Sequence, residues 1–392
     1  MKKSRTKQIP LCRTVEQMPP SGIREFFRLT SSMPDAISLS IGEPDFVTPW
    51  HIRETAIYAL ENGYTMYTAN EGMIELRQEV SNYLARTQKL KYNAEKEVLI
   101  TTGTSEALDL ALRAMLNPGD EVIIPDPCYV AYPACITMAG GRAVRVATSE
   151  ENCFNPQVKD MRRATTPKTK AILIGNPANP TGAVFSRQEL IEIASFAGEH
   201  NLLVIADEIY SSLVYGIEHT CFPTLKDMRE RTVLINGFSK SHAMTGWRVG
   251  YVAAPQRIVG LMTKIHQYSM LCAPIVAQMA AIEALKRGDS EVKAMVAEYN
   301  QRRKFMLSGF REMGLTCFEP RGAFYCFPNI TGSGLSSDEF STRLLHEEKV
   351  AVVPGTAFGE CGEGFVRCCY ATSLKDIREA LKRMRRFLQR LE

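Results

Sequence analysis

The chain has 392 residues, of which 45% are hydrophobic and 23% are charged, which is ordinary for a globular protein with one large domain or two domains. Its 47 lysine and arginine residues against 43 aspartate and glutamate residues give a net charge of +4, which is too balanced to predict nucleic acid or a membrane surface as a partner. No apolar run approaches the roughly 18 residues of a membrane span, and no apolar segment follows the basic N-terminus as it would in a signal peptide.

The eleven cysteines are scattered, lie mostly inside apolar runs and include no CxxC pair. This pattern predicts reduced core thiols and argues against a disulfide framework or a zinc site. We therefore expect a cytoplasmic protein without a bound metal.

The N-terminal residues 1–48 are predicted to form an arm and part of a small domain, with a short helix near Ile23–Leu29. In the run AISLSIGEPDF, alternating apolar residues from Ile37 onward predict a short strand that Gly42 ends. Gly42 either makes a turn or lets the backbone approach a ligand closely.

Two helices are expected next, over residues 50–62 and from about Gly72, because apolar residues recur there at helical spacing. Tyr67 lies in the polar loop between them. Taken alone, a loop tyrosine indicates a surface or packing residue.

A βαβ unit is predicted over residues 98–124. The turn between its first strand and its helix contains Gly103, Thr104 and Ser105. Free backbone N–H groups and the positive end of the helix dipole make such a turn suited to an anion. The hydroxyl groups either cap the helix or bind a phosphate. Tyr129, just after the second strand, either stacks on a flat ring or packs in the core.

Two further strands each end in polar residues. Ala171–Ile174 leads into the sharply turned loop GNPANPTG, whose prolines help to aim Asn179. After the next helix, Leu202–Ala206 ends in Asp207, with Tyr210 close behind. A carboxylate directly after an apolar strand is costly to bury unless it is paired, so Asp207 either caps a helix or meets a partner in a site.

The stretch from Thr232 to Pro255 has two apolar runs that predict strands, joined by a loop with Ser239, Lys240 and Arg248. A Ser-Lys pair alone is usually part of a solvated loop. At the end of a buried strand, however, burial and a nearby guanidinium both disfavour the ammonium form of lysine. Such an amine is nucleophilic near neutral pH, as a Schiff-base lysine must be. Arg248 keeps its proton and suits a phosphate, so the loop suggests pyridoxal phosphate.

Strands near positions 99, 123, 172, 204, 234 and 251, with helices between several of them, predict an α/β fold. We expect a mostly parallel, open sheet of the seven-stranded type with helices on both faces. Ligands of such sheets lie beyond the carboxyl ends of the strands. The candidate residues between Thr102 and Lys240 fall at those ends, so we expect them to share one site.

The remaining sequence predicts a smaller α+β domain. A long helical stretch over residues 256–313 is followed by short strands in TCFEP, GAFYCFP, VAVVPG and FVRCCYAT and by a last helix from about residue 374. Arg367 stands in the middle of one of these strands, where it either faces solvent or clamps a carboxylate with two hydrogen bonds. The expected division is an arm at 1–48, a large domain at 49–285 and a small domain at 286–392.

With these residues assembled, the chain resembles a fold type I aminotransferase of the class I/II superfamily, which depends on pyridoxal phosphate. The resemblance covers nearly the whole chain and rests on IGEPDF, YT-ANEGMIELR, GTSEAL, NPANPTG, DEIY, SKSHAMTGWRVGY, GAFY and VRCCYAT. It is of the aspartate and aromatic aminotransferase kind and extends to bacterial N-acetyl-diaminopimelate aminotransferases. It implies a homodimer with two sites at the subunit interface.

The resemblance also implies roles for the candidate residues. Lys240 is the Schiff-base lysine and proton shuttle, Asp207 holds the pyridine nitrogen protonated, and Tyr210 bonds the 3-oxygen of the ring. The other implied cofactor contacts are Gly103, Thr104, Ser105, Tyr129, Asn179, Ser239, Arg248 and, on the phosphate of the partner subunit's site, Tyr67. The implied substrate contacts are Gly42, Tyr129, Asn179 and Arg367, the last as the clamp on the α-carboxylate. Some relatives have a hydroxyl where Gly237 stands, which leaves the role of Ser239 open. The role of His242 is open as well.

The implied function is transfer of an amino group between an L-amino acid and a 2-oxo acid by a ping-pong Schiff-base mechanism, with glutamate and 2-oxoglutarate as one pair. Aspartate, aromatic amino acids and N-acylated diaminopimelate precursors all stay open as the other partner, because no second arginine can be assigned to a side-chain carboxylate. A C–S β-lyase that uses the same cofactor is the alternative within the fold. A cofactor-sensing transcription regulator and a nicotinamide dehydrogenase are disfavoured, because the sequence has neither a helix-turn-helix pattern nor a GxGxxG after a strand.

Overall fold

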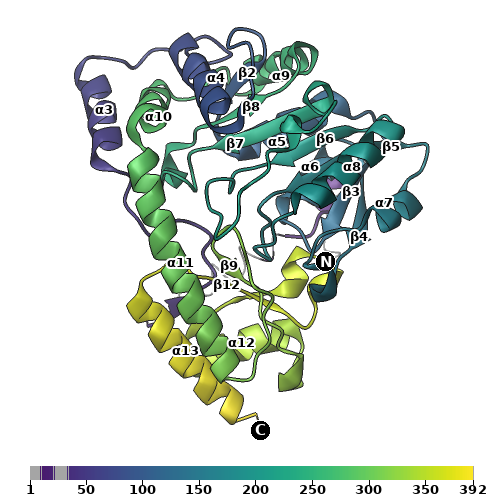
Figure 1. Ribbon diagram of the computed structural model, residues 1–392, viewed down its shortest axis with the longest axis vertical. Coiled ribbons are helices and arrows are strands. Elements are labelled where there is room, and N and C mark those ends of the chain that lie inside the picture. Colours follow the sequence, from purple (N-terminus) through teal and green to yellow (C-terminus); the bar gives the residue numbers. More distant parts are fainter. Residues whose placement is uncertain (1–8, 10, 21, 23–32, 34, 392) are drawn as a thin grey trace, which may run out of the picture.

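The computed structural model describes residues 9, 11–20, 22, 33 and 35–391 (Figure 1). The short helix predicted near Ile23–Leu29 lies outside these residues, whereas the helix α1 (Arg13–Glu16) was not expected. None of the helices in the described part of the chain combines the length and the apolar character that crossing a lipid bilayer requires.

A seven-stranded sheet organises the larger part of the molecule, as predicted. Its strand order is β2-β8-β7-β6-β5-β3-β4, and only β8 runs antiparallel to its neighbours. The strands are β2 (Val98–Thr101), β3 (Glu121–Asp126), β4 (Arg142–Ala147), β5 (Thr169–Gly175), β6 (Leu203–Asp207), β7 (Thr232–Gly237) and β8 (Gly250–Ala253). The sequence did not predict β4, because this edge strand is largely exposed, begins with Arg142 and has its apolar residues interrupted by Arg145.

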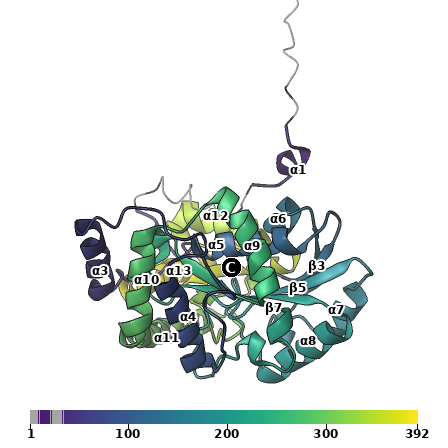
Figure 2. The ribbon, with the colours of Figure 1, turned by 90° about the horizontal axis from the view of Figure 1, so that it is seen from above.

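Helices cover both faces of this sheet (Figure 2). One face packs against α5 (Gly103–Met115), α6 (Ala131–Met138) and α9 (Gln256–Ser269). The other face packs against α7 (Val158–Ala164) and α8 (Arg187–Glu199) on the side of β3 to β6, and against α3, α4 and α10 on the side of β2 and β8. These last helices span Trp50–Glu61, Ile74–Gln88 and Ile275–Arg287. The sheet is therefore buried on both sides, which explains its continuous apolar strands.

The smaller part of the molecule lies below the sheet in Figure 1. Its antiparallel sheet has the order β11-β12-β9, and a separate pair joins β1 to β10. The strands are β1 (Ile37–Ser38), β9 (Tyr325–Cys326), β10 (Val350–Ala351), β11 (Val353–Pro354) and β12 (Val366–Cys369), and the helices are α11 (Asp289–Glu312), α12 (Ser337–Glu348) and α13 (Leu374–Gln389). Because β1 pairs with β10, a segment near the N-terminus belongs to this part. The domain boundaries at 49 and 286 stay a prediction.

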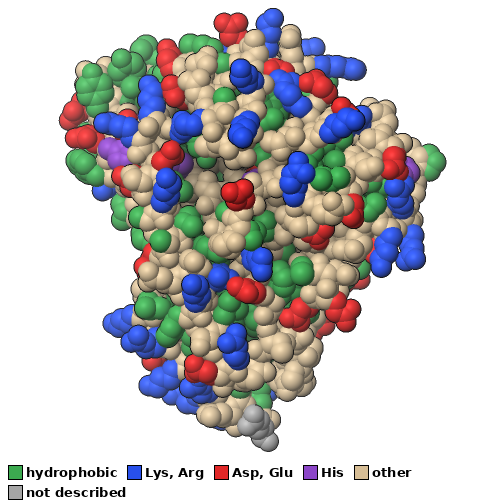
Figure 3. Space-filling model, in the orientation of Figure 1, with side chains coloured by type: hydrophobic (Ala, Val, Ile, Leu, Met, Phe, Trp, Pro, Cys, Tyr) green, Lys and Arg blue, Asp and Glu red, His purple; other side chains and the backbone are tan. Residues whose placement is uncertain are grey.

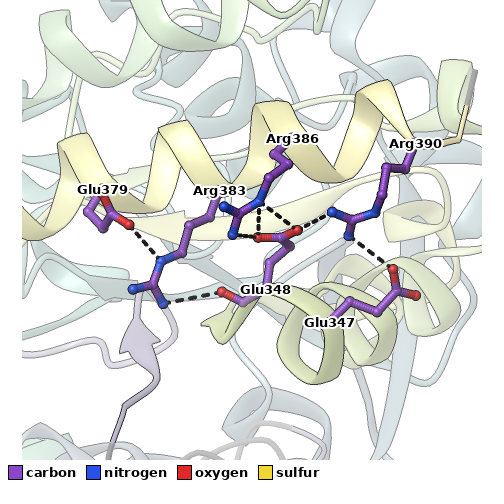
Figure 4. A network of polar contacts seen from close by, with 6 residues as sticks. All are labelled: Glu347, Glu348, Glu379, Arg383, Arg386 and Arg390. Carbon is purple, nitrogen blue, oxygen red and sulfur yellow. Dashed lines mark hydrogen bonds and ion pairs between the residues drawn. The ribbon is translucent and has the colours of Figure 1, made fainter.

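One buried carboxylate, Glu348, joins the last two helices (Figure 4). It lies at the end of α12 and forms ion pairs with Arg386 and Arg390 of α13, and Arg383 donates to its backbone carbonyl at 3.3 Å. The hydrogen bonds from Arg386 hold the pKa of Glu348 below its usual value. The apolar face of α13, with Ile377 and Phe387 buried, packs on the core beside this network.

Candidate active site

A cavity of about 450 Å³ lies at the carboxyl ends of the parallel strands. It brings together most of the residues that the sequence predicted for the site. These are Gly42, Thr104, Ser105, Tyr129, Asn179, Asp207, Tyr210, Ser239, Lys240, Arg248 and Arg367. Residues from both parts of the molecule line it, since Asp207 ends β6 of the seven-stranded sheet and Arg367 belongs to β12 of the smaller sheet.

Lys240 follows β7 and points its amine into this cavity. Its Nζ donates to the backbone carbonyl of Gly42 at 2.5 Å and lies 6.0 Å from the centre of the Tyr210 ring. Burial lowers the pKa of Lys240 to about 8, and the guanidinium groups of Arg367 and Arg248 act in the same direction. The sequence-based expectation of an amine that loses its proton easily is therefore confirmed in direction.

Asp207 ends β6 as a buried carboxylate. One of its oxygens accepts a hydrogen bond from the Tyr132 hydroxyl at 2.9 Å, and the other accepts one from the backbone N–H of Ile209 at 3.3 Å. Burial raises the pKa of Asp207 to about 6, and these two hydrogen bonds partly oppose the increase. No helix begins at Asp207, so the capping alternative does not apply. A positively charged group in the cavity would stabilise this carboxylate.

The turn before α5 is shaped to receive an anion. Its first residues leave backbone N–H groups without helical partners, and neither hydroxyl of Thr104 and Ser105 caps the helix, because the cap residue is Thr102 and makes no side-chain cap bond. Gly103 has a φ of +78°, and a Cβ there would lie 2.6 Å from Nη2 of Arg248. Glycine at this position therefore lets the guanidinium lie directly against the turn.

Arg367 occupies the opposite end of the cavity and is only 2% exposed. Nη1 donates to Oδ1 of Asn179 at 2.9 Å and Nη2 to the backbone carbonyl of Ser40 at 2.6 Å, while Nε is buried without a partner among the described residues. Of the two sequence-based interpretations, the solvent-facing arginine is wrong. The buried fork, with one donor unsatisfied, suits a carboxylate entering from the cavity.

Two tyrosines complete the wall between these ends. The Tyr210 hydroxyl lies 2.8 Å from the Tyr325 hydroxyl, and the guanidinium of Arg367 lies 4.4 Å from the centre of the Tyr325 ring. Tyr129 is half-buried and meets the ring of Tyr132 edge-on at 5.6 Å. Its position at the cavity wall agrees with the predicted contact to a flat ring.

Two predicted residues do not line the cavity of this chain. Gly103 lies just behind it, in contact with Arg248. Tyr67 is 81% exposed in the loop between α3 and α4. His242, whose role the sequence left open, is buried outside the cavity with its Nδ1 2.8 Å from the Ser241 hydroxyl, and burial lowers its pKa to about 4. It is a neutral core residue.

Sequence reasoning missed three residues of the site: Ser40, Tyr132 and Tyr325. Ser40 contributes only a backbone carbonyl, which no side-chain pattern can reveal. Tyr132 lies on α6, a helix that the sequence did not predict because Pro133 stands in its first turn. Tyr325 stands in the quoted motif GAFY, and its place in that motif was the available indication.

Known proteins resemble this chain over nearly its whole length. The family described as aminotransferase class I and II matches residues 34–384. A putative aminotransferase of Bacillus subtilis (strain 168), YugH, is 53% identical over 96% of this chain and 97% of its own length. An aspartate aminotransferase of Pyrococcus abyssi is 45% identical over 94% of this chain and 96% of its own.

Solved structures agree in fold. The crystal structure of an aromatic aminotransferase from Pyrococcus horikoshii superimposes with a TM-score of 0.90 at 43% identity, covering 93% of this chain and 99% of that one. The names of these relatives favour transamination over the C–S β-lyase reaction. The chain therefore belongs to the aminotransferase class I and II family and is a transaminase.

Proposed function

We propose that this transaminase uses pyridoxal phosphate, which Lys240 binds covalently in the cavity between the two parts of the chain. The observation that carries the proposal is the arrangement of three groups around one cavity of about 450 Å³: the amine of Lys240, the carboxylate of Asp207 and the guanidinium of Arg367. A Schiff-base amine, a partner for a pyridinium and a clamp for a carboxylate are the groups that this chemistry needs.

The residues present fit this cofactor. The cradle of Gly103 and Arg248, into which a Cβ would intrude, suits the phosphate group. Asp207, whose pKa burial raises to about 6, gains most from a positively charged ring nitrogen beside it. Tyr129 would lie against the ring, and Tyr210 with Asn179 would bond its 3-oxygen. We propose that Ser239, Thr104 and Ser105, which also line the cavity, contact the cofactor as well.

Each residue then has a defined task. When bound, the cofactor supplies a sink for the electrons left when the substrate loses its α-proton. Arg367 and Asn179, with the backbone at Gly42, orient the substrate through its carboxylate. The amine of Lys240 would serve as the base that takes the α-proton of the substrate and as the acid that returns it, and a pKa of about 8 suits both directions of this transfer.

The substrates of the proposed reaction are identified by assays of the purified protein. We propose glutamate and 2-oxoglutarate as one pair, with aspartate, an aromatic amino acid or an N-acyl-diaminopimelate-type compound on the other side. A panel of amino donors with 2-oxoglutarate, followed by the absorbance change as the cofactor takes up the amino group, ranks the donors by kcat/KM. Release of pyruvate from cystathionine without an oxo-acid acceptor would instead support a lyase.

The free, mostly buried cysteines support the proposed cytoplasmic location.

Substitution of Arg367 by lysine is expected to lower kcat/KM for amino acids by about 10- to 100-fold, because an ammonium cannot replace a two-pronged hydrogen bond to a carboxylate. Rates are measured with an amino acid and with the corresponding amine that lacks the carboxylate. We expect the loss only for the amino acid. An equal loss for both compounds would show that Arg367 does not bind the carboxylate.

We further propose that the protein is a homodimer with Tyr67 reaching the partner subunit's site. Exposed apolar side chains gather over α3 and the loop that follows it (upper left in Figure 3). They are Trp50, Ile57, Tyr58, Leu60, Tyr64, Met66 and Tyr67. A patch of this kind on one chain suits a second copy as its cover.

Heterodimers test this arrangement. Tyr67→Ala is expected to weaken cofactor affinity roughly tenfold through the loss of a hydrogen bond to a charged group, and a Lys240→Ala dimer should be inactive. A doubly tagged heterodimer of the two variants should recover one complete site, with half the wild-type activity and wild-type cofactor affinity. If its active sites bind the cofactor as weakly as the Tyr67→Ala dimer does, Tyr67 serves its own chain.

A further inference from the structure

Tyr325 touches three groups to which the proposed function gives separate tasks. Its hydroxyl lies 2.8 Å from that of Tyr210. The guanidinium of Arg367 lies 4.4 Å from the centre of its ring. The third group is Gly42, whose carbonyl accepts a hydrogen bond from the Lys240 amine. The Tyr325 hydroxyl lies so close to Gly42 that a Cβ there would overlap it. Tyr325 is 1% exposed, so these contacts are made without competing water.

Each of the two tyrosines has a single proton, and this limits what the pair can do. If Tyr210 donates to Tyr325, its proton is no longer available to a group in the cavity. If Tyr325 donates to Tyr210, the proton of Tyr210 is free to point into the cavity, and a hydroxyl that accepts a bond becomes a better donor itself. The contact between the two hydroxyls therefore decides whether Tyr210 can serve a ligand.

The positive charge of Arg367 favours the second arrangement. A cation over the face of an aromatic ring draws electron density from it, which makes the hydroxyl of Tyr325 the stronger donor. Tyr210 has a more distant counterpart, because the cation nearest to its ring among the described residues is the Lys240 amine at 6.0 Å, compared with 4.4 Å between Arg367 and the Tyr325 ring. Among the described residues, Tyr325 has no hydrogen-bond acceptor other than Tyr210 for its proton.

We propose that Tyr325 is a positioning residue that donates to Tyr210 and thereby turns the proton of Tyr210 toward the cofactor. This inference rests on the proposed function, since it assigns Tyr210 to the cofactor's 3-oxygen. It also links two ends of the cavity: a substrate carboxylate that neutralises Arg367 weakens the donor strength of Tyr325 and, through it, that of Tyr210.

The test is a pH titration of the cofactor's absorbance in the loaded protein, without substrate. A donor to the negatively charged 3-oxygen favours loss of the nearby nitrogen proton, so its removal raises the midpoint. We expect Tyr210→Phe to raise the midpoint by roughly one pH unit or more and Tyr325→Phe by a few tenths of a unit to one unit. In the double variant, Tyr325→Phe should add nothing.

A matched control separates the hydroxyl from the ring. Phe358 also lies under Arg367, at 4.9 Å, but has no hydroxyl, so Phe358→Leu should change the KM for amino acids and leave the midpoint unchanged. An unchanged midpoint in Tyr325→Phe, or a full additional shift in the double variant, would overturn the proposal. If the wild type itself shows no cofactor absorbance, and borohydride attaches no cofactor to Lys240, the proposed function fails. A thermal melt of each loaded variant verifies that it is folded.

Discussion

Lys240→Ala is expected to abolish covalent attachment of the cofactor and to lower transamination by at least about 10³-fold. Two contributions are lost together: the nucleophilic amine that receives the cofactor and the base that moves the substrate proton. The cofactor can still bind noncovalently, because the turn at Gly103 and Arg248 is untouched. The measurement is the single-turnover rate of the loaded variant with the best amino donor of the panel.

Borohydride reduction provides the companion measurement. In the wild type, the reduced tag should appear on the peptide that contains Lys240, and in the variant on none. Lys240→Arg is the matched control, because it keeps a positive charge next to the Gly42 carbonyl but cannot form the linkage. A tag on another peptide, or transamination near the wild-type rate in Lys240→Ala, would remove the basis of the proposed chemistry.

Asp207→Asn is expected to lower kcat by roughly 10²- to 10³-fold, corresponding to about 3 kcal/mol of lost transition-state stabilisation. Asparagine keeps the size of the side chain and can still bond Tyr132 and the N–H of Ile209, so the change removes mainly the charge. Without that charge, the ring nitrogen of the cofactor has no buried anion to keep it protonated. The matched control is Glu208→Gln, which removes the adjacent buried carboxylate, one that does not line the cavity. An equal loss in both variants would mean that the fold, and not the ring nitrogen, has been disturbed.

The same substitution should stabilise the cofactor-free protein above about pH 6. The folded pKa of Asp207, about 6, exceeds its ordinary value of 3.8 because burial disfavours the charged form. Below pH 3.8 the carboxyl group is protonated in both the folded and the unfolded protein, so its burial costs no charge. As pH rises from 3.8 through about 6, the unfolded protein releases this proton first, and the free energy of unfolding falls. Denaturant unfolding at pH 8 should show Asp207→Asn to be more stable than the wild type by up to about 3 kcal/mol, and the advantage should shrink toward pH 4. A variant less stable at every pH would contradict this.

Much of the fold was predictable because its elements carry their own patterns. The buried strands β2, β3, β5, β6, β7 and β8 are continuous apolar runs, and the parallel topology then places the ends of those strands on one edge. Lys240, Asp207 and Asn179 could be predicted as one site for that reason. The places of Arg367 and Gly42 came from the resemblance, since no periodicity brings the end of the chain to its beginning.

What the sequence could not predict depends on contacts between distant segments. Tyr132 reaches Asp207 across 75 positions and Tyr325 reaches Tyr210 across 115. Neither contact leaves a local pattern, because a tyrosine that binds a carboxylate and one that packs in the core occupy similar apolar surroundings. The pairing of Glu348 with α13 is of the same kind, since Glu348 ends an ordinary amphipathic helix in the sequence.

The bond between Arg367 and the carbonyl of Ser40 spans 327 positions. At roughly 5–20 residues per second, a ribosome needs about 16 to 65 s to add the residues between them. A nascent chain can thus form the turn at Gly103 before the segment around Ser40 meets β10 and β12. Under the proposed roles, the contact that orients the substrate carboxylate therefore forms later than the turn that would hold the phosphate of the cofactor, because Arg367 is made after both Gly103 and Arg248.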